Sequence, residues 1–171
     1  DQLVFTVGGT PAPTFFRDYA VESDPAIEAG TFVSGGKADL EKDDTSYYTV
    51  KQVNDVVQWT AVSQGITLDT ISSIEVILVG RVDKGSPLQQ IFVFNPTDPA
   101  HTAGGFDTAA DSQLTYAAIN TDTTHSFFLS AGDVAYVASL VPKEVRIRVK
   151  ATSTTVGWSL IADRLVFRVK P

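Results

Sequence analysis

Short runs of strand-forming residues recur along the whole chain, and turn-forming residues separate them. Nine segments are rich in Val, Ile, Thr, Tyr and Phe and are bounded by Gly, Pro, Asn or Asp. They span residues 3–7, 47–53, 56–62, 71–80, 88–95, 112–119, 124–130, 145–151 and 158–169. This pattern predicts an all-β protein in which two antiparallel sheets pack as a β-sandwich. A closed barrel is the alternative architecture.

Only one segment has the spacing of a helix. In "SAGDVAYVASLVP" (130–142), Val134, Val137, Ala138 and Val141 recur at helical intervals, and Pro142 would end such a helix. We therefore expect at most one short helix, near residues 130–141.

The cations of this acidic chain gather in its last two predicted strands. The net charge is -7, but residues 143–171 contain seven cations and only two acids. In "VRIRVK" (145–150) and "RLVFRVK" (164–170), apolar residues alternate with cations. Successive side chains of a strand point to opposite faces, so Val, Ile, Leu and Phe are expected in the core and the cations outside. If the two strands are neighbours, they form one basic stripe.

This stripe carries the main functional hypothesis. We expect it to meet an acidic surface of another copy of the chain, or of a surface or particle protein. The predicted interface residues are Arg146, Arg148, Lys150, Arg164 and Arg168. The alternative is a solvated outer face whose cations pair with acids of the same sheet. The acidic balance argues against nucleic-acid binding, and no apolar run is long enough for a membrane span.

The first 29 residues stand apart from the rest. Leu3, Val4 and Phe5 begin a strand-like run, which the Gly- and Pro-containing stretch "GGTPAPTFF" (8–16) follows. We predict an N-terminal extension (1–29) and a sandwich domain (30–171). The N-terminal strand either closes an edge of its own sandwich or pairs with a neighbouring copy, where Leu3, Val4 and Phe5 would lie in the interface.

No catalytic signature is present. The chain has no Cys, which excludes a disulfide, a thiolate metal site and a Cys nucleophile. Its two histidines, His101 and His125, belong to no metal-ligand motif and are expected in exposed loops. No nucleotide-binding loop and no hydrolase nucleophile motif occurs. We therefore expect neither an enzyme nor a cofactor.

An acidic cluster, "DLEKDD" (39–44), raises a calcium hypothesis. Asp39, Glu41, Asp43 and Asp44 would supply oxygen ligands, and Asp163 would approach from the last strand. The alternative, which we favour, is a solvated turn in which Asp43 or Asp44 accepts hydrogen bonds from nearby amides. The sequence leaves the metal question open.

The two tryptophans are the candidate aromatic ligands of a sugar. Trp59 lies within a predicted strand and is expected in the core. Trp158 lies where a loop meets the last strand, so it is either a core residue or an exposed platform for a glycan.

From Gly30 onward the chain resembles a family of jelly-roll-like β-sandwich domains of secreted and surface bacterial proteins. The matching segments are "GTFVSGGKADLEKDDTSYYTV" (30–50), "ISSIEVILVGRV" (71–82), "QQIFVFN" (89–95), "VRIRVKATS" (145–153) and "SLIADRLVFRV" (159–169). The last of these is also similar to the final strand of many carbohydrate-binding sandwich modules.

The resemblance implies secretion and a non-catalytic role. An Asp at position 1 is also what cleavage after a secretion signal would leave, although excision from a longer polypeptide explains it equally well. We therefore expect an extracellular or cell-surface structural domain that assembles through protein contacts, as in a surface layer, filament or particle. A carbohydrate-binding module and a bacteriophage capsid or decoration protein are the alternatives.

Overall fold

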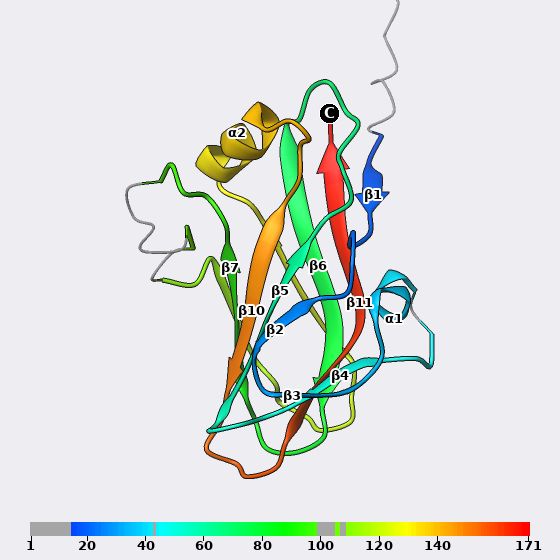
Figure 1. The fold of residues 1–171 in the computed structure, drawn as a ribbon, viewed down its shortest axis with the longest axis vertical. Coiled ribbons are helices and arrows are strands. Elements are labelled where there is room, and N and C mark those ends of the chain that lie inside the picture. The colour runs from blue at the N-terminus through cyan, green and yellow to red at the C-terminus, as the bar shows by residue number, and fades with distance from the viewer. Residues whose placement is uncertain (1–14, 43, 99–104, 107–108) are drawn as a thin grey trace, which may run out of the picture.

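Two antiparallel sheets pack face to face in the computed structural model, which describes residues 15–42, 44–98, 105–106 and 109–171 (Figure 1). The six-stranded sheet has the order β3 (Thr31–Ser34), β4 (Tyr48–Lys51), β11 (Ser159–Lys170), β6 (Ser73–Val82), β9 (Thr123–Phe128), and β1 (Arg17–Tyr19) also pairs with β11. The five-stranded sheet has the order β2 (Ala26–Ala29), β5 (Val56–Val62), β10 (Arg146–Thr152), β7 (Leu88–Val93), β8 (Ser112–Thr115).

The eight strands from β4 to β11 follow the order of a jelly roll. One sheet contains β4, β11, β6 and β9, and the other contains β5, β10, β7 and β8. The consecutive pairs β4 and β5, β6 and β7, β8 and β9, and β10 and β11 therefore each have one strand in each sheet. Two interlocked Greek keys have this connectivity. The predicted all-β, jelly-roll-like sandwich is confirmed, and the described strands form no closed barrel.

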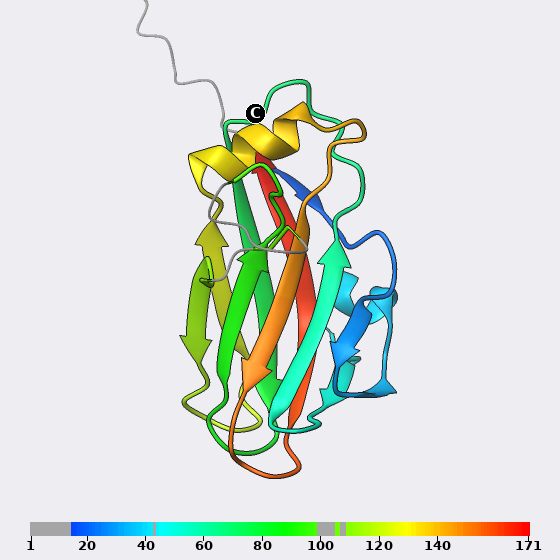
Figure 2. The same ribbon diagram turned by 60° about the vertical axis from the view of Figure 1, so that its left-hand side comes forward.

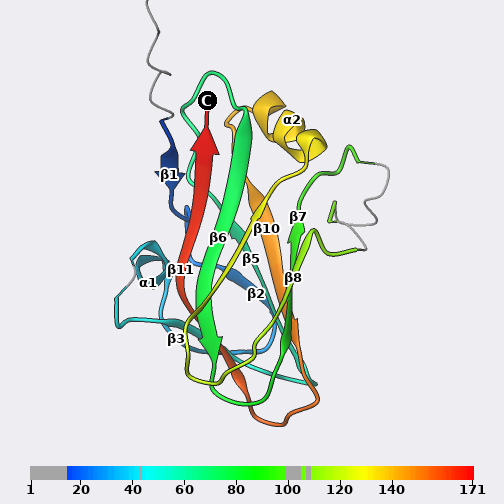
Figure 3. The same cartoon turned by 180° about the vertical axis from the view of Figure 1, so that it is seen from behind.

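The last two strands lie in different sheets, so the predicted single basic stripe is wrong. β10 pairs with β5 and β7, whereas β11 pairs with β4, β6 and β1 (Figures 2 and 3). The predicted faces are nevertheless correct. The apolar side chains predicted to face the core are all fully buried, with 0% exposure: Val145, Ile147, Val149, Leu165, Phe167 and Val169. The cations of the two strands consequently project from opposite outer faces of the sandwich.

Both tryptophans lie in the core between the sheets. Trp59 and Trp158 are each 0% exposed. The ring of Trp59 packs edge-on against Tyr48, with 5.8 Å between centroids. The core position predicted for Trp59 is confirmed. A glycan platform on Trp158 does not fit the structure, because its whole side chain is covered by protein.

The predicted helix is present as α2 (Ala131–Ser139). Ser130 caps it by accepting a hydrogen bond from the Asp133 amide at 3.2 Å, and Val134 and Val137 are buried. A second, five-residue helix, α1 (Lys37–Glu41), was not expected. It lies beside β11 and buries Leu40, which explains why a short segment with three charged residues becomes ordered (Figure 1).

Residues 17–29 contribute strands to both sheets. β1 pairs with the end of β11, and β2 pairs with β5. The predicted strand that contains Leu3, Val4 and Phe5 lies outside the described residues, and the division between 1–29 and 30–171 stays a prediction. Neither helix is long and apolar enough to cross a membrane, within the part of the chain that the structure describes.

Candidate functional site

The outer face of the five-stranded sheet carries a row of cations along β10. Arg146, Arg148 and Lys150 point outward because their neighbours Ile147 and Val149 fill the core. Two aromatic rings accompany the arginines. The Arg146 guanidinium lies 4.8 Å from the centre of the Phe94 ring, and that of Arg148 lies 4.1 Å from the centre of the Phe106 ring. Cation–π contacts of this kind favour an arginine that stays beside its aromatic ring.

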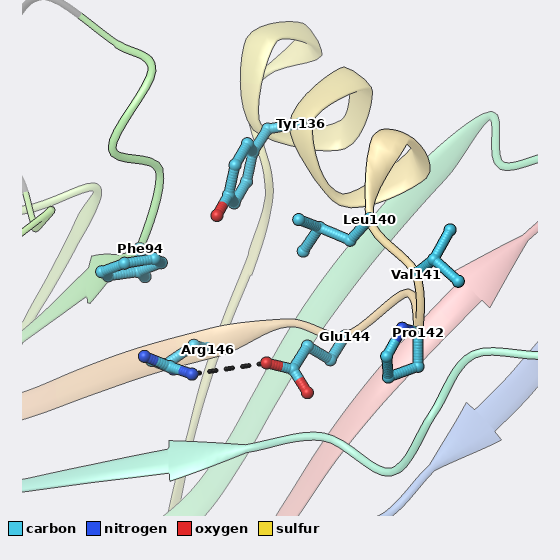
Figure 4. A pocket seen from close by; sticks show the side chains of 7 residues that line it. All are labelled: Phe94, Tyr136, Leu140, Val141, Pro142, Glu144 and Arg146. Carbon is cyan, nitrogen blue, oxygen red and sulfur yellow. Dashed lines mark hydrogen bonds and ion pairs between the residues drawn. The ribbon is translucent and has the colours of Figure 1, made fainter.

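A small pocket opens at the end of this row nearest α2 (Figure 4). Its volume is about 180 Å³, and its polar side chains are Glu144 and Arg146, whose Oε1 and Nη2 atoms are 3.4 Å apart. The rings of Phe94 and Tyr136 stand on one side, with centroids 6.3 Å apart and planes inclined by 59°. The remaining lining is apolar and comes from Leu140, Val141 and Pro142.

A buried hydrogen-bond chain fixes the two rings relative to each other. Asn95 follows Phe94 directly, and its Nδ2 donates to Oδ1 of Asp133 at 3.0 Å. The other carboxylate oxygen of Asp133 accepts from the Ser130 hydroxyl at 2.6 Å. Asn95 and Asp133 are only 2% and 3% exposed. The end of β7 is thereby tied to the first turn of α2, one turn before Tyr136.

The pocket is suited to one small, uncharged, hydroxyl-bearing ring. It is smaller than the roughly 300–1,000 Å³ of sites that enclose drug-sized ligands. The aromatic faces of Phe94 and Tyr136 can pack against the C–H face of a ring. Glu144 and Arg146 neutralise each other, so the pocket offers hydrogen-bond acceptors and donors without a net charge.

The five predicted interface cations divide between two faces, and acids of the N-terminal strands β1 and β2 reach three of them. Glu28 of β2 pairs with Arg148, with its Oε2 2.9 Å from Nε. Asp18 of β1 pairs with Arg168 at 2.9 Å and lies 3.9 Å from Arg164. Arg146 pairs with its own neighbour Glu144, as described above. This is the alternative arrangement, in which cations pair with acids of their own sheet. An interface role for these residues stays a prediction.

The acidic cluster forms local hydrogen bonds. Oδ2 of Asp39 accepts from the Gly36 amide, and Oδ1 of Asp44 accepts from the Ser46 amide, both at 2.7 Å. Asp163 is buried at a bulge in β11, and Asp43 lies outside the described residues. Among the residues that the structure describes, no three His or acidic side chains are placed to hold a metal ion.

His125 is buried rather than exposed, which corrects the sequence prediction. It lies on β9 and is 4% exposed. Its Nδ1 is 2.8 Å from Nε2 of Gln89, and its Nε2 is 2.7 Å from the Ser112 hydroxyl. These contacts link β9 of one sheet to β7 and β8 of the other. Sequence reasoning missed them because a lone His carries no signal for burial. His101 lies outside the described residues.

The hydrogen bonds around His125 also fix its tautomer. The Tyr116 hydroxyl donates to Oε1 of Gln89 at 2.8 Å, so the Gln89 amide nitrogen faces Nδ1 and donates to it. The proton of the neutral ring is then on Nε2 and is donated to Ser112. A hydrolase needs the reverse, a His that accepts the Ser proton. Burial lowers the pKa of His125 and raises that of Tyr116. The cluster therefore has a structural role, because its hydrogen bonds hold the two sheets together.

Comparisons with known proteins find similar folds but no sequence family. No family model matches the chain, and no curated protein matches it. One similar solved structure is that of the carbohydrate-binding module TmCBM61 with β-1,4-galactotriose (TM-score 0.47, 9% identity, 94% of this chain and 90% of that one). A second is the carbohydrate-binding module CBM6cm-2 of Cellvibrio mixtus lichenase 5A with cellotriose (TM-score 0.46, 13% identity, 91% and 97%).

A third similar structure is the K1 cleaved adhesin domain of Lys-gingipain from Porphyromonas gingivalis W83 (TM-score 0.48, 12% identity, 94% of this chain and 92% of that one). Identities and TM-scores this low transfer neither a ligand nor a binding residue to this chain. The function must be inferred from the chain's own surface.

Proposed function

We propose that this chain is a non-catalytic, extracellular carbohydrate-binding domain that holds a neutral sugar ring in the pocket beside Phe94 and Tyr136. The observation that carries the proposal is the lining of this pocket, in which two aromatic rings adjoin a mutually neutralised Glu144–Arg146 pair. A sugar ring has an apolar C–H face and a hydroxyl rim, and the pocket offers a partner for each.

The geometry supports this function better than self-assembly through the basic strands. Assembly was predicted from a continuous stripe of unpaired cations, but the structure separates the cations onto two faces. Arg148 and Arg168 each form a bidentate ion pair with an acid of the same chain. Cations that already form ion pairs within the chain contribute little binding free energy toward a second acidic surface.

The test is binding of wild type and pocket variants to an array of neutral oligosaccharides, followed by calorimetry on the best ligand. Tyr136→Ala removes one ring and Phe94→Leu replaces the other with an apolar side chain. Each is expected to weaken binding by roughly 10-fold, the loss of one well-formed aromatic contact. The matched control is Phe128→Ala, which truncates a 63% exposed ring on the other sheet and should leave the affinity unchanged.

Circular dichroism of each variant checks that the fold is retained. If both pocket variants bind the glycan with wild-type affinity, the sugar does not bind in this pocket. Failure of the wild-type protein to bind any glycan on the array would refute the proposed function itself.

A further inference from the structure

A second polar feature crosses the same sheet face at the opposite end of β10. The strand registers place Gln58 of β5 opposite Lys150, Lys150 opposite Gln90 of β7, and Gln90 opposite Gln113 of β8. Paired residues of neighbouring strands share a face, so these four side chains form one outward row across four strands. We call them the amide row. Three amides and one ammonium side by side provide hydrogen-bond donors at every position.

The amide row ends in an open hollow. Lys150 and Gln58 line it together with Glu28 and Asn54, and its volume is about 560 Å³. Ala29, Gly30 and two valines complete the lining. This hollow is larger and more polar than the pocket beside Tyr136, so it can take more than one hydroxyl-bearing unit.

Lys150 differs from the other cations of β10 in its charge balance. Arg146 is paired with Glu144, and Arg148 is paired with Glu28. Within the described residues, Lys150 has no acidic partner. Glu28 also lines the hollow, but it already accepts hydrogen bonds from Arg148 and from the Gln58 amide. Among the described residues that line the hollow, one positive charge is therefore left uncompensated.

We propose that the amide row recognises an acidic sugar unit, whose single anionic group lies against Lys150 while its hydroxyls bind the glutamine amides. The inference deepens the proposed function and rests on it. A polyanion with a charge on every unit does not fit, because one ammonium is offered by a chain of net charge -7. Arg146 and Lys150 are about 13 Å apart along the strand, so one oligosaccharide can reach both sites.

The experiment compares polysaccharides that differ only in their acidic group. One pair is a glucuronoxylan with uronic acid on a minority of its units and its carboxyl-reduced product; the other is a sparsely sulfated galactan and its desulfated form. Affinity electrophoresis with each polymer is run for wild type, Lys150→Gln and Lys170→Gln. Lys150→Gln removes the charge but keeps a polar side chain. Lys170→Gln makes the same charge change on β11, on the other sheet.

Wild type should bind at least one acidic polymer about fivefold more tightly than its neutral partner, and salt should reduce this preference. Lys150→Gln should bring the affinity for the acidic polymer down to that for its neutral partner, so that the preference is lost. Lys170→Gln should behave as wild type. Preference in the first pair alone assigns a carboxylate, and preference in the second alone assigns a sulfate ester.

Equal binding of acidic and neutral polymers by wild type would overturn the inference, and so would a preference that survives in Lys150→Gln. If in that case Tyr136→Ala still loses neutral-glycan binding, the proposed function stands and only the amide row is refuted. Absence of binding to every glycan would refute both.

Discussion

Arg168 of β11 and Asp18 of β1 form a bidentate ion pair, with Nε 2.9 Å from Oδ1 and Nη2 3.0 Å from Oδ2. The hydrogen bonds to Asp18, and then the charges of Asp18 and Glu75, raise the pKa of Arg168. The pair joins two strands that are 150 residues apart in sequence. It indicates why an acidic chain has cations in its final strands: both strands lie inside their sheets, where acids from other strands flank them.

Asp18→Asn should lower the free energy of unfolding only modestly. Both side chains are more than a third exposed, so solvent weakens the interaction to about 0.5–1 kcal/mol. Urea unfolding at low and high salt measures the change, which should shrink as salt rises. Glu41→Gln, which breaks the partly exposed Lys37–Glu41 pair, is the control for losing one surface acid. A loss of several kcal/mol in Asp18→Asn would mean that this carboxylate is far less solvated than the structure shows.

Trp158→Ala should destabilise the fold by about 3–5 kcal/mol, because it leaves a large cavity between the sheets. Urea unfolding followed by circular dichroism measures this loss. A glycan platform on the surface would behave in the opposite way, with lost binding and nearly wild-type stability. The second pattern would contradict the buried position of Trp158.

The free energy of unfolding should fall as the pH drops below about 6.5, because of His125. Its ring is neutral and buried in the folded protein, and burial lowers its pKa. The unfolded chain takes up a proton near pH 6.5, before the folded protein can, so acid favours unfolding. The slope reaches at most about 1.4 kcal/mol per pH unit and ends at the lower, folded pKa.

Urea unfolding between pH 7.5 and pH 5 tests this for wild type and His125→Gln. The variant should be less stable than wild type at every pH. Its free energy of unfolding should, however, depend less steeply on pH, because the contribution of His125 is absent. The informative quantity is the slope and not the absolute stability. Parallel pH profiles for the two proteins would show that His125 is not held neutral.

Deleting residues 1–14 tests the remaining assembly prediction. If the strand that contains Leu3, Val4 and Phe5 pairs with another copy, the full chain should associate and the deletion variant should be monomeric by light scattering. A cut at Gly30 would be a poor test, because it also removes β1 and β2 with Asp18 and Glu28. Monomers in both proteins at all protein and salt concentrations would exclude self-assembly through this strand.

Local alternation in the sequence predicted which side chains are buried, but not which strands are neighbours. Ile147 and Arg148 were assigned to the correct faces because a strand has a two-residue period. The sheet in which each strand lies depends on long-range pairing, which no local pattern encodes. The same limit applies to the candidate site. Phe94, Tyr136 and Arg146 come from three separate elements, and nothing in the sequence around them indicates that they meet.

The positions of β10 and β11 also determine when the chain can fold. They are the last jelly-roll strands in chain order, yet each is hydrogen-bonded on both sides and separates two earlier strands of its sheet. A nascent chain that ends before residue 146 therefore lacks the centre of both sheets and exposes strand edges and apolar faces. We expect folding to be slow, as for other proteins with mostly long-range contacts, and to begin only after the final strand has been synthesised.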